Sequence, residues 1–188
     1  MRKLKLQIQM TIDGFVASPD GGLDWQWLPG ERDDAMFQKV IELADSCDTI
    51  LLGRKMTRGF IDHWENGVAA GTISPDQDLA HRMVNMRKIV FSRTQTAIKG
   101  KNVEVENGDL DAAIQALKKQ PGKDIIVYGG ANFVSSLISE NLIDEYYIFR
   151  NPVAIGSGLP IFKDRKVLKL ESTIAYGNGK VLNKYLPG

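Results

Sequence analysis

The stretch KDIIVYGGANFV, residues 123–134, joins a short apolar run to a helix-like segment through two adjacent glycines. An apolar run of this length, followed at once by a turn and a helix, is typical of a buried strand in an α/β sheet. Gly129 and Gly130 lack Cβ atoms, so the backbone can turn sharply there and a ligand can approach the main chain. In an open α/β sheet, ligands bind at strand-to-helix junctions of this kind.

The rest of the chain repeats this alternation before ending in strands. Strands are predicted over residues 4–10, 48–53, 87–92, 103–106 and 125–128, and helices over residues 33–46, 75–86, 109–120 and 131–141. Three strand-like segments follow from residue 143, and the last two are joined by Gly177-Asn178-Gly179, a strong hairpin signal. The order predicts one domain over residues 1–188, with a mainly parallel central sheet and an antiparallel C-terminal hairpin at one edge.

Composition limits the classes of partner. The 24 basic and 23 acidic side chains nearly cancel, so no overall field draws the chain to nucleic acid or to an anionic membrane. We therefore expect a small-molecule substrate and no nucleic-acid or membrane partner, with self-association as a homodimer through residues 143–155, a segment that we expect to expose a sheet edge. Cys47 is the only cysteine, and no apolar segment is long enough for a membrane span, so we expect a cytoplasmic protein.

Two further junctions carry groups suited to a phosphorylated ligand. Gly53 ends a predicted strand and is followed by Arg54, Lys55 and Thr57, where unpaired amide groups and two cations favour an anion. A solvated basic turn is the alternative interpretation of this segment. Ser92-Arg93-Thr94 ends the next predicted strand, where hydroxyl and guanidinium groups are suited to a ribose phosphate, although such a segment is more often a plain loop.

A long glycine-rich loop near the N-terminus supplies candidates for substrate binding. Trp25 and Trp27 are suited to stack on a planar ring, and five acidic side chains are suited to bind its polar edge: Asp13, Asp24, Glu31, Asp33 and Asp34. Core packing of the tryptophans and helix capping by the acids are the alternatives. No metal site is predicted, because the two histidines have no partners at ligand spacing and one cysteine cannot build a thiolate site.

Taken in order, these segments resemble the dihydrofolate reductase-like fold, and in particular the family of the C-terminal reductase domain of the bifunctional riboflavin-biosynthesis protein. The segments that carry the resemblance are TIDG, LLGRKMT, IVFSRT, IIVYGGANFV, LIDEYYIFRNPVAIGSGLPIF and the final hairpin. The resemblance implies a three-layer α/β/α reductase that uses NADPH. The chain differs from true folate reductases in the loop after WLP, and it lacks the deaminase half of the riboflavin enzyme.

The resemblance also assigns residues by position. It implies cofactor contacts at Gly53, Arg54, Lys55, Met56, Thr57, Ser92, Arg93, Thr94, Gly129, Gly130, Ala131 and Asn132. It implies substrate contacts at Asp13, Gly14, Trp25, Glu31 and Asp34, with Asp13 and Glu31 as the catalytic candidates. Two functions follow as hypotheses. One is an NADPH-dependent reductase that transfers hydride to a C=N or C=O carbon of a pyrimidine- or pterin-like heterocycle, and the other is a non-catalytic NADP-binding module.

Overall fold

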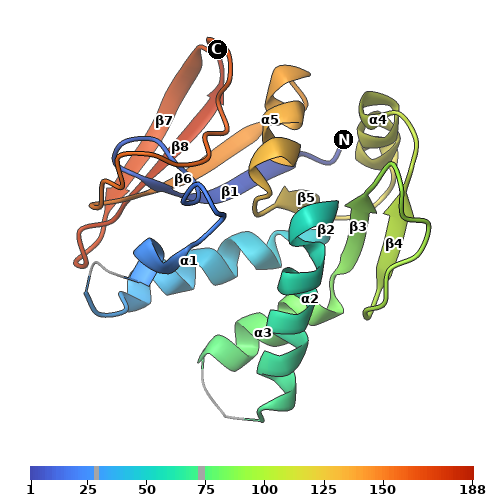
Figure 1. Cartoon of the computed structure of the whole chain (residues 1–188), viewed down its shortest axis with the longest axis horizontal. Coiled ribbons are helices and arrows are strands. Elements are labelled where there is room, and N and C mark those ends of the chain that lie inside the picture. Colours follow the sequence, from blue (N-terminus) through green and yellow to red (C-terminus); the bar gives the residue numbers. More distant parts are fainter. Residues whose placement is uncertain (28–29, 72–74) are drawn as a thin grey trace.

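The computed structural model describes residues 1–27, 30–71 and 75–188, and they form three layers (Figure 1). The sheet contains β1 (Leu4–Thr11), β2 (Cys47–Gly53), β3 (Arg87–Phe91), β4 (Val103–Glu106), β5 (Asp124–Val127), β6 (Glu145–Asn151), β7 (Leu168–Ala175) and β8 (Val181–Pro187). The helices are the 3-10 turn η1 (Asp24–Trp27), α1 (Asp34–Asp45), α2 (Arg54–Ala69), α3 (Pro75–Asn85), α4 (Leu110–Lys119) and α5 (Ala131–Ser139). The capping role of Ser74 predicted for α3 lies outside the described residues.

The sheet has the strand order β4-β3-β2-β5-β1-β6-β8-β7. All pairings from β4 to β6 are parallel, whereas β8 pairs antiparallel with both β6 and β7. The turn at Gly177-Asn178-Gly179 joins β7 to β8, and Gly179 adopts a φ of 81° there. The predicted mainly parallel sheet with an antiparallel C-terminal hairpin is therefore confirmed.

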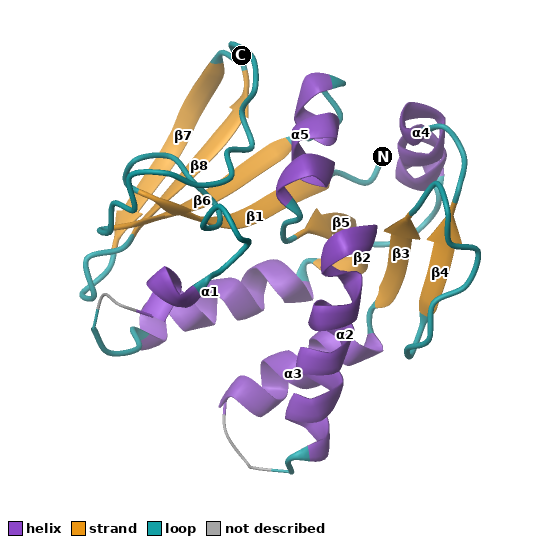
Figure 2. Cartoon of the chain, in the orientation of Figure 1, coloured by secondary structure: helices purple, strands orange, loops and turns teal. Residues whose placement is uncertain are grey.

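Helices cover both faces of this sheet (Figure 2). On one face α4 and α5 pack through apolar residues such as Ile114 and Leu137, which are fully buried with the even-numbered apolar residues of β1. On the other face α1 and α3 pack through residues such as Ile41 and Met83, and half-buried side chains of α2 join them. Burial of both faces explains why the parallel strands read as short apolar runs.

One helix was not among the predicted elements, and one expectation about the sheet is wrong. The basic segment after Gly53 is the first turn of the long helix α2, which the sequence analysis did not predict; its buried residues Thr57 and Ile61 are four positions apart, as an amphipathic helix requires. Residues 143–155 do not expose a sheet edge, because β6 lies between β1 and β8 and its aromatic side chains are buried. The edge strand on that side is β7.

Lys88, near the start of β3, joins α3 to the loop before β4. Its side chain is 2% exposed, and its ammonium donates to the carbonyls of Val84 at 2.8 Å, Met86 at 2.8 Å and Lys101 at 3.2 Å. Burial lowers the pKa of Lys88 from 10.5 to about 8. The charged form is therefore less favoured in the folded chain than in the unfolded chain.

We predict that Lys88→Met lowers the free energy of unfolding by about 1–3 kcal/mol at neutral pH, because three buried carbonyls lose this donor. The pKa of Lys88 is about 8 in the folded chain and has its ordinary value of 10.5 in the unfolded chain. At a pH between these two pKa values, the unfolded chain therefore binds more protons than the folded chain. The unmodified protein should therefore gain stability relative to the variant as pH rises through that window. Urea unfolding of both proteins at neutral pH and at about pH 9.5 measures this, and a stability difference that shrinks with rising pH contradicts it.

Candidate functional site

Three of the predicted junctions lie next to one another at the carboxyl edge of the sheet. They follow β3, β2 and β5, which are consecutive strands running in the same direction. The loop at residues 92–94 follows β3, α2 follows β2, and the glycine pair leads from β5 into α5 (Figure 1). The structure therefore brings together the residues that the sequence analysis assigned to one dinucleotide.

Two of the helices that begin at this edge, α2 and α5, have no side-chain cap. The N-cap residues of α2 and α5 are Gly53 and Gly130, and neither has a side chain that could accept from the first amide groups of its helix. In contrast, Asp33 and Asp109 cap α1 and α4, each accepting a backbone N–H at 2.9 Å. The first amide groups of α2 and α5 therefore remain available to bind an anion.

Close packing at the two junctions requires glycine. A Cβ on Gly53 would lie 2.7 Å from the Cβ of Phe133 in α5, so β2 and α5 can approach only without a side chain there. Gly130 has a left-handed φ of 84°, and a Cβ on it would lie 3.2 Å from the Sδ atom of Met56. Met56, in the first turn of α2, thus covers the glycine pair from the side of the other junction.

The polar groups of this edge divide into two kinds. Arg54 and Lys55 are exposed in the first turn of α2, and among the described residues neither makes a hydrogen bond or an ion pair; the same is true of Arg93 after β3. Thr57 is fully buried and donates to the Gly53 carbonyl at 3.0 Å. Ser92 is buried and accepts the N–H groups of the loop that follows it, at 3.2 and 2.9 Å. The two hydroxyls therefore hold the junctions in shape, while the three cations face solvent.

Ala131 and Asn132 form the first turn of α5, directly after the glycine pair. Ala131 is half-buried and packs against the core beneath α5, whereas Asn132 is exposed. Their backbone N–H groups belong to the uncapped start of α5, so their contribution at this edge comes from the main chain.

Asp13 follows β1 and holds two loops together. Its carboxylate is exposed and accepts the N–H groups of Ile155 at 3.0 Å and Gly156 at 2.8 Å. Hydrogen bonding from the Thr11 side chain and from these two amides lowers the pKa of Asp13. A carboxylate held in its ionised form fixes the loop, and it is poorly suited to donate a proton. Gly14 next to it adopts a φ of 94°.

The other candidates for substrate binding lie around the start of α1. Trp25 is buried in η1 with 2% exposed, whereas Trp27 is 78% exposed. Glu31 lines a cavity of about 450 Å³ between the start of α1 and the β7–β8 turn. Asp34 is exposed and pairs with Arg32 at 3.4 Å. The structure therefore separates these side chains into one buried ring, one exposed ring and exposed carboxylates.

Asp33, a rival of Glu31 in the sequence analysis, joins α1 to the C-terminal hairpin. It caps α1 and also accepts the N–H group of Gly177 at 2.7 Å. Hydrogen bonds from Met36 and then Gly177 hold its pKa below the ordinary value. The helix-capping alternative is therefore confirmed for Asp33.

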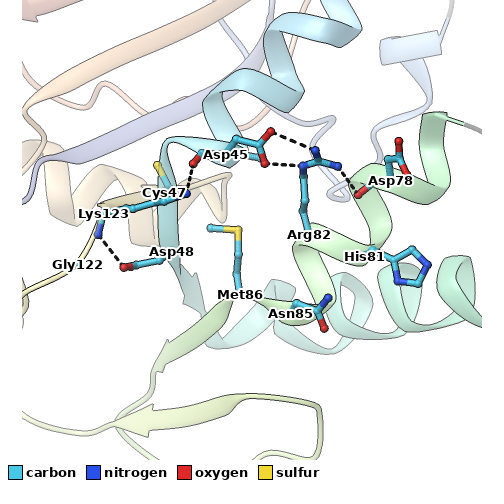
Figure 3. A pocket seen from close by; sticks show the side chains of 11 residues that line it. Asp45, Cys47, Asp48, Asp78, His81, Arg82, Asn85, Met86, Gly122 and Lys123 are labelled. Carbon is cyan, nitrogen blue, oxygen red and sulfur yellow. Dashed lines mark hydrogen bonds and ion pairs between the residues drawn. The ribbon is translucent and has the colours of Figure 1, made fainter.

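A larger cavity lies away from this edge, at the amino ends of β2 and β5 (Figure 3). It measures about 600 Å³, and several of its charged groups already have partners: Arg82 donates to Asp45 at 2.6 and 3.1 Å, and Asp48 accepts the backbone N–H of Lys123 at 2.8 Å. The described residues form no cluster of histidine, cysteine and carboxylate groups suited to a metal. The candidate site is therefore the carboxyl edge.

A doubly covered parallel sheet that presents two uncapped helix starts and an antiparallel C-terminal hairpin defines a dihydrofolate reductase-like protein. The chain belongs to the RibD C-terminal domain family, whose model matches residues 2–182. It is 33% identical over 185 residues to the uncharacterised protein YyaP of Bacillus subtilis (strain 168), covering 96% of this chain and 92% of YyaP. The family indicates a reductase-like protein.

Solved structures show the same fold. The deaminase/5-amino-6-(5-phosphoribosylamino)uracil reductase of Thermotoga maritima superposes with a TM-score of 0.68 at 19% identity, over 100% of this chain and 57% of that one. Dihydrofolate reductase of Enterococcus faecalis, complexed with NADP(H), superposes with a TM-score of 0.64 at 15% identity, over 99% of this chain and 96% of that one. In the described part of this chain, no helix combines the length and the apolar character that crossing a membrane requires.

We predict that Gly53→Ala lowers the free energy of unfolding by about 1–3 kcal/mol, because the new methyl group meets the Phe133 Cβ and the junction must separate. Gly59→Ala in the middle of α2 is the matched control, since a Cβ there has no neighbour within 4 Å. That control should be neutral or stabilising by roughly 0.5–1 kcal/mol through helix propensity. Urea unfolding measures both, and equal stabilities of the two variants would contradict the close-packing argument.

Proposed function

We propose that the protein is an NADPH-dependent reductase that transfers hydride to a C=N or C=O carbon of a small pyrimidine- or pterin-like heterocycle. One observation carries the proposal: two uncapped helix starts, and two cations that have no partner among the described residues, meet at adjoining ends of β2 and β5. Family membership and the fold support a reductase. The substrate class and the use of NADPH go beyond what family membership and the fold support, and they are part of the proposal.

The residues present fit a phosphorylated dinucleotide. The amide groups that begin α2 and α5 are suited to a pyrophosphate, since backbone N–H groups and the positive end of the helix dipole both favour anions. Arg54 and Lys55 are suited to the extra phosphate that distinguishes NADPH from NADH. Gly129 and Gly130 leave the main chain open to a ring or ribose, with Met56 as the movable neighbour.

The chain's own contribution to the reaction is binding and orientation. When bound, the nicotinamide supplies the hydride. Half-buried Met56, Phe60 and Tyr128 form an apolar wall beside the glycine pair, and the last two rings stack at 6.1 Å, which excludes water from that side. The ionised Asp13 fixes the loop after β1 against residues 155–156. These groups would hold two reactants in one geometry, which is a large part of the rate enhancement in such reactions.

We predict that replacing Arg54 and Lys55 together by alanine weakens NADPH binding by about tenfold or more per lost charged hydrogen bond, while NADH binding changes far less. Arg58→Ala is the matched control, because Arg58 lies on the same helix but pairs with Asp62 at 2.9 Å. Calorimetric titration with both cofactors measures the effect. Equal binding of NADPH and NADH by the unmodified protein would overturn the assignment of the two cations.

We also predict that Gly130→Val abolishes NADPH binding in a folded protein, because the side chain fills the approach to the main chain. Gly71→Val controls for backbone strain, since Gly71 also has a positive φ, of 65°, but follows the far end of α2. Circular dichroism checks folding and calorimetry measures binding. If Gly130→Val still binds NADPH, the glycines serve only the turn.

Turnover separates the reductase from a non-catalytic NADP-binding module. Steady oxidation of NADPH in the presence of 5-amino-6-(5-phosphoribosylamino)uracil or dihydrofolate supports the reductase. Tight NADPH binding without oxidation by either compound favours the binding module.

A further inference from the structure

Asn107 and Gly108 directly follow β4, and they form one of three Asn-Gly pairs in the chain. Asparagine is most prone to lose its side-chain amide before glycine, because the backbone nitrogen of a residue without a Cβ can reach the preceding side-chain carbonyl carbon. The other two pairs are Asn66-Gly67 and Asn178-Gly179. Their surroundings differ from those of Asn107, so the chain contains its own comparison.

The amide of Asn107 holds the loop after β3 against the end of β4. Its Nδ2 atom donates to the Ser92 carbonyl and, at 2.8 Å, to the Gln95 carbonyl. The backbone adds a third bond, since the Ser92 N–H donates to the Glu106 carbonyl at 3.0 Å. The loop that carries the exposed Arg93 is therefore tied at both of its ends to the residue after β4.

A carboxylate contacts the glycine of this pair. The Gly108 N–H donates to the Glu106 Oε1 at 2.6 Å. A carboxylate in this position can accept the proton that the nitrogen loses as it attacks, which is general-base assistance. Asn107 itself is exposed, so water has access to it.

The other two pairs lack such a base on the glycine nitrogen. Asn66 and Gly67 lie within α2, where backbone N–H groups bond to carbonyls of the helix. In the turn between β7 and β8, the N–H of Gly179 donates to the Tyr176 carbonyl at 3.0 Å. A backbone carbonyl accepts a hydrogen bond, but it is a far weaker base than a carboxylate.

We propose that Asn107 is a modification site, and that its conversion to aspartate releases the loop at residues 92–95 and weakens binding of the dinucleotide. The effect on binding rests on the proposed function, because that function places this loop beside the cofactor. The modification and the release of the loop do not depend on it.

The reaction requires water and no other co-reactant. The Gly108 nitrogen gives up its proton to the Glu106 carboxylate and forms a bond to Asn107 Cγ. The Cγ–Nδ2 bond breaks, and the side-chain nitrogen takes up a proton and leaves as ammonia. Water then opens the resulting cyclic imide at either of its two carbonyl carbons, which gives aspartate or isoaspartate.

Aspartate at position 107 reverses the hydrogen-bonding character of the side chain. An ionised carboxylate only accepts hydrogen bonds, and the two groups that it would face, the carbonyls of Ser92 and Gln95, also only accept. Two hydrogen bonds are lost, and the oxygens repel one another. The loop then separates from the end of β4, and Arg93 is no longer held at the carboxyl edge of the sheet.

Incubation of the full chain in mildly alkaline buffer, followed by peptide mass spectrometry, measures the modification. We expect Asn107 to convert about tenfold or more faster than Asn178. Glu106→Gln should slow the conversion of Asn107 by about tenfold, because an amide cannot take up the proton. Faster conversion of Asn178, or an unchanged rate in Glu106→Gln, overturns the assignment of the site.

Asn107→Asp reproduces the product and isolates its effect. NADPH binding in calorimetry should weaken about three- to tenfold, and amide hydrogen exchange within residues 92–95 should become faster. Asn102→Asp is the matched control. Asn102 precedes β4, and its Nδ2 donates to the Asn85 carbonyl at 2.8 Å, at the opposite end of β3 from this loop. The control should leave both measurements unchanged.

The outcomes separate this inference from the proposed function. Unchanged hydrogen exchange in Asn107→Asp overturns the release of the loop. If the unmodified protein and Asn107→Asp bind NADPH equally well, the effect on binding is wrong and the proposed function stands. If the unmodified protein does not bind NADPH, the proposed function fails, while mass spectrometry and hydrogen exchange still decide the modification and the release of the loop.

Discussion

The position of β5 between β1 and β2 is the constraint on which the rest of the structure depends. Only four residues long, β5 pairs in parallel with both neighbours, through Leu4 with Ile125 on one side and Ile50 with Ile126 on the other. Parallel pairing sends every strand from β4 to β6 toward the same edge. The junctions after β3, β2 and β5 must therefore lie side by side, and the glycine pair lies between the start of α2 and β1.

Much of this arrangement follows from local sequence pattern. Apolar runs such as residues 48–53 predict buried strands, and the Gly177-Asn178-Gly179 turn predicts the final hairpin, because both depend on neighbouring residues alone. The order of the strands in the sheet does not follow from local sequence pattern. The burial of β6 depends on β8 inserting between it and β7, which is a long-range pairing, so the expectation of an exposed edge at residues 143–155 is wrong. Likewise α2 was missed because its apolar face is narrow and begins in a basic turn.

For the candidate site too, the features that depend on local sequence could be predicted, and those that depend on long-range packing could not. The cofactor junctions could be found because glycines and cations directly follow apolar runs, a signal carried by each segment alone. The packing of Phe133 against Gly53 could not, since 80 positions separate them and only the pairing of β2 with β5 brings the start of α5 against the end of β2.

Whether a charged or polar group has a hydrogen-bond or ion-pair partner in the fold distinguishes groups that stabilise the structure from groups that are available to a ligand. Burying a charge costs several kcal/mol unless it is paired, so a fold that pairs Lys5 with Asp124 and Lys118 with Asp144 uses these lysines for its own stability. Glu145 follows the same rule, since Lys3 and the Tyr147 hydroxyl both donate to it. Several charged groups at the edge where parallel strands end depart from this rule. There, within the described residues, Arg54 and Lys55 have no partner and α2 and α5 have no side-chain cap, and these hydrogen-bonding groups are the binding capacity that the chain can offer to a ligand.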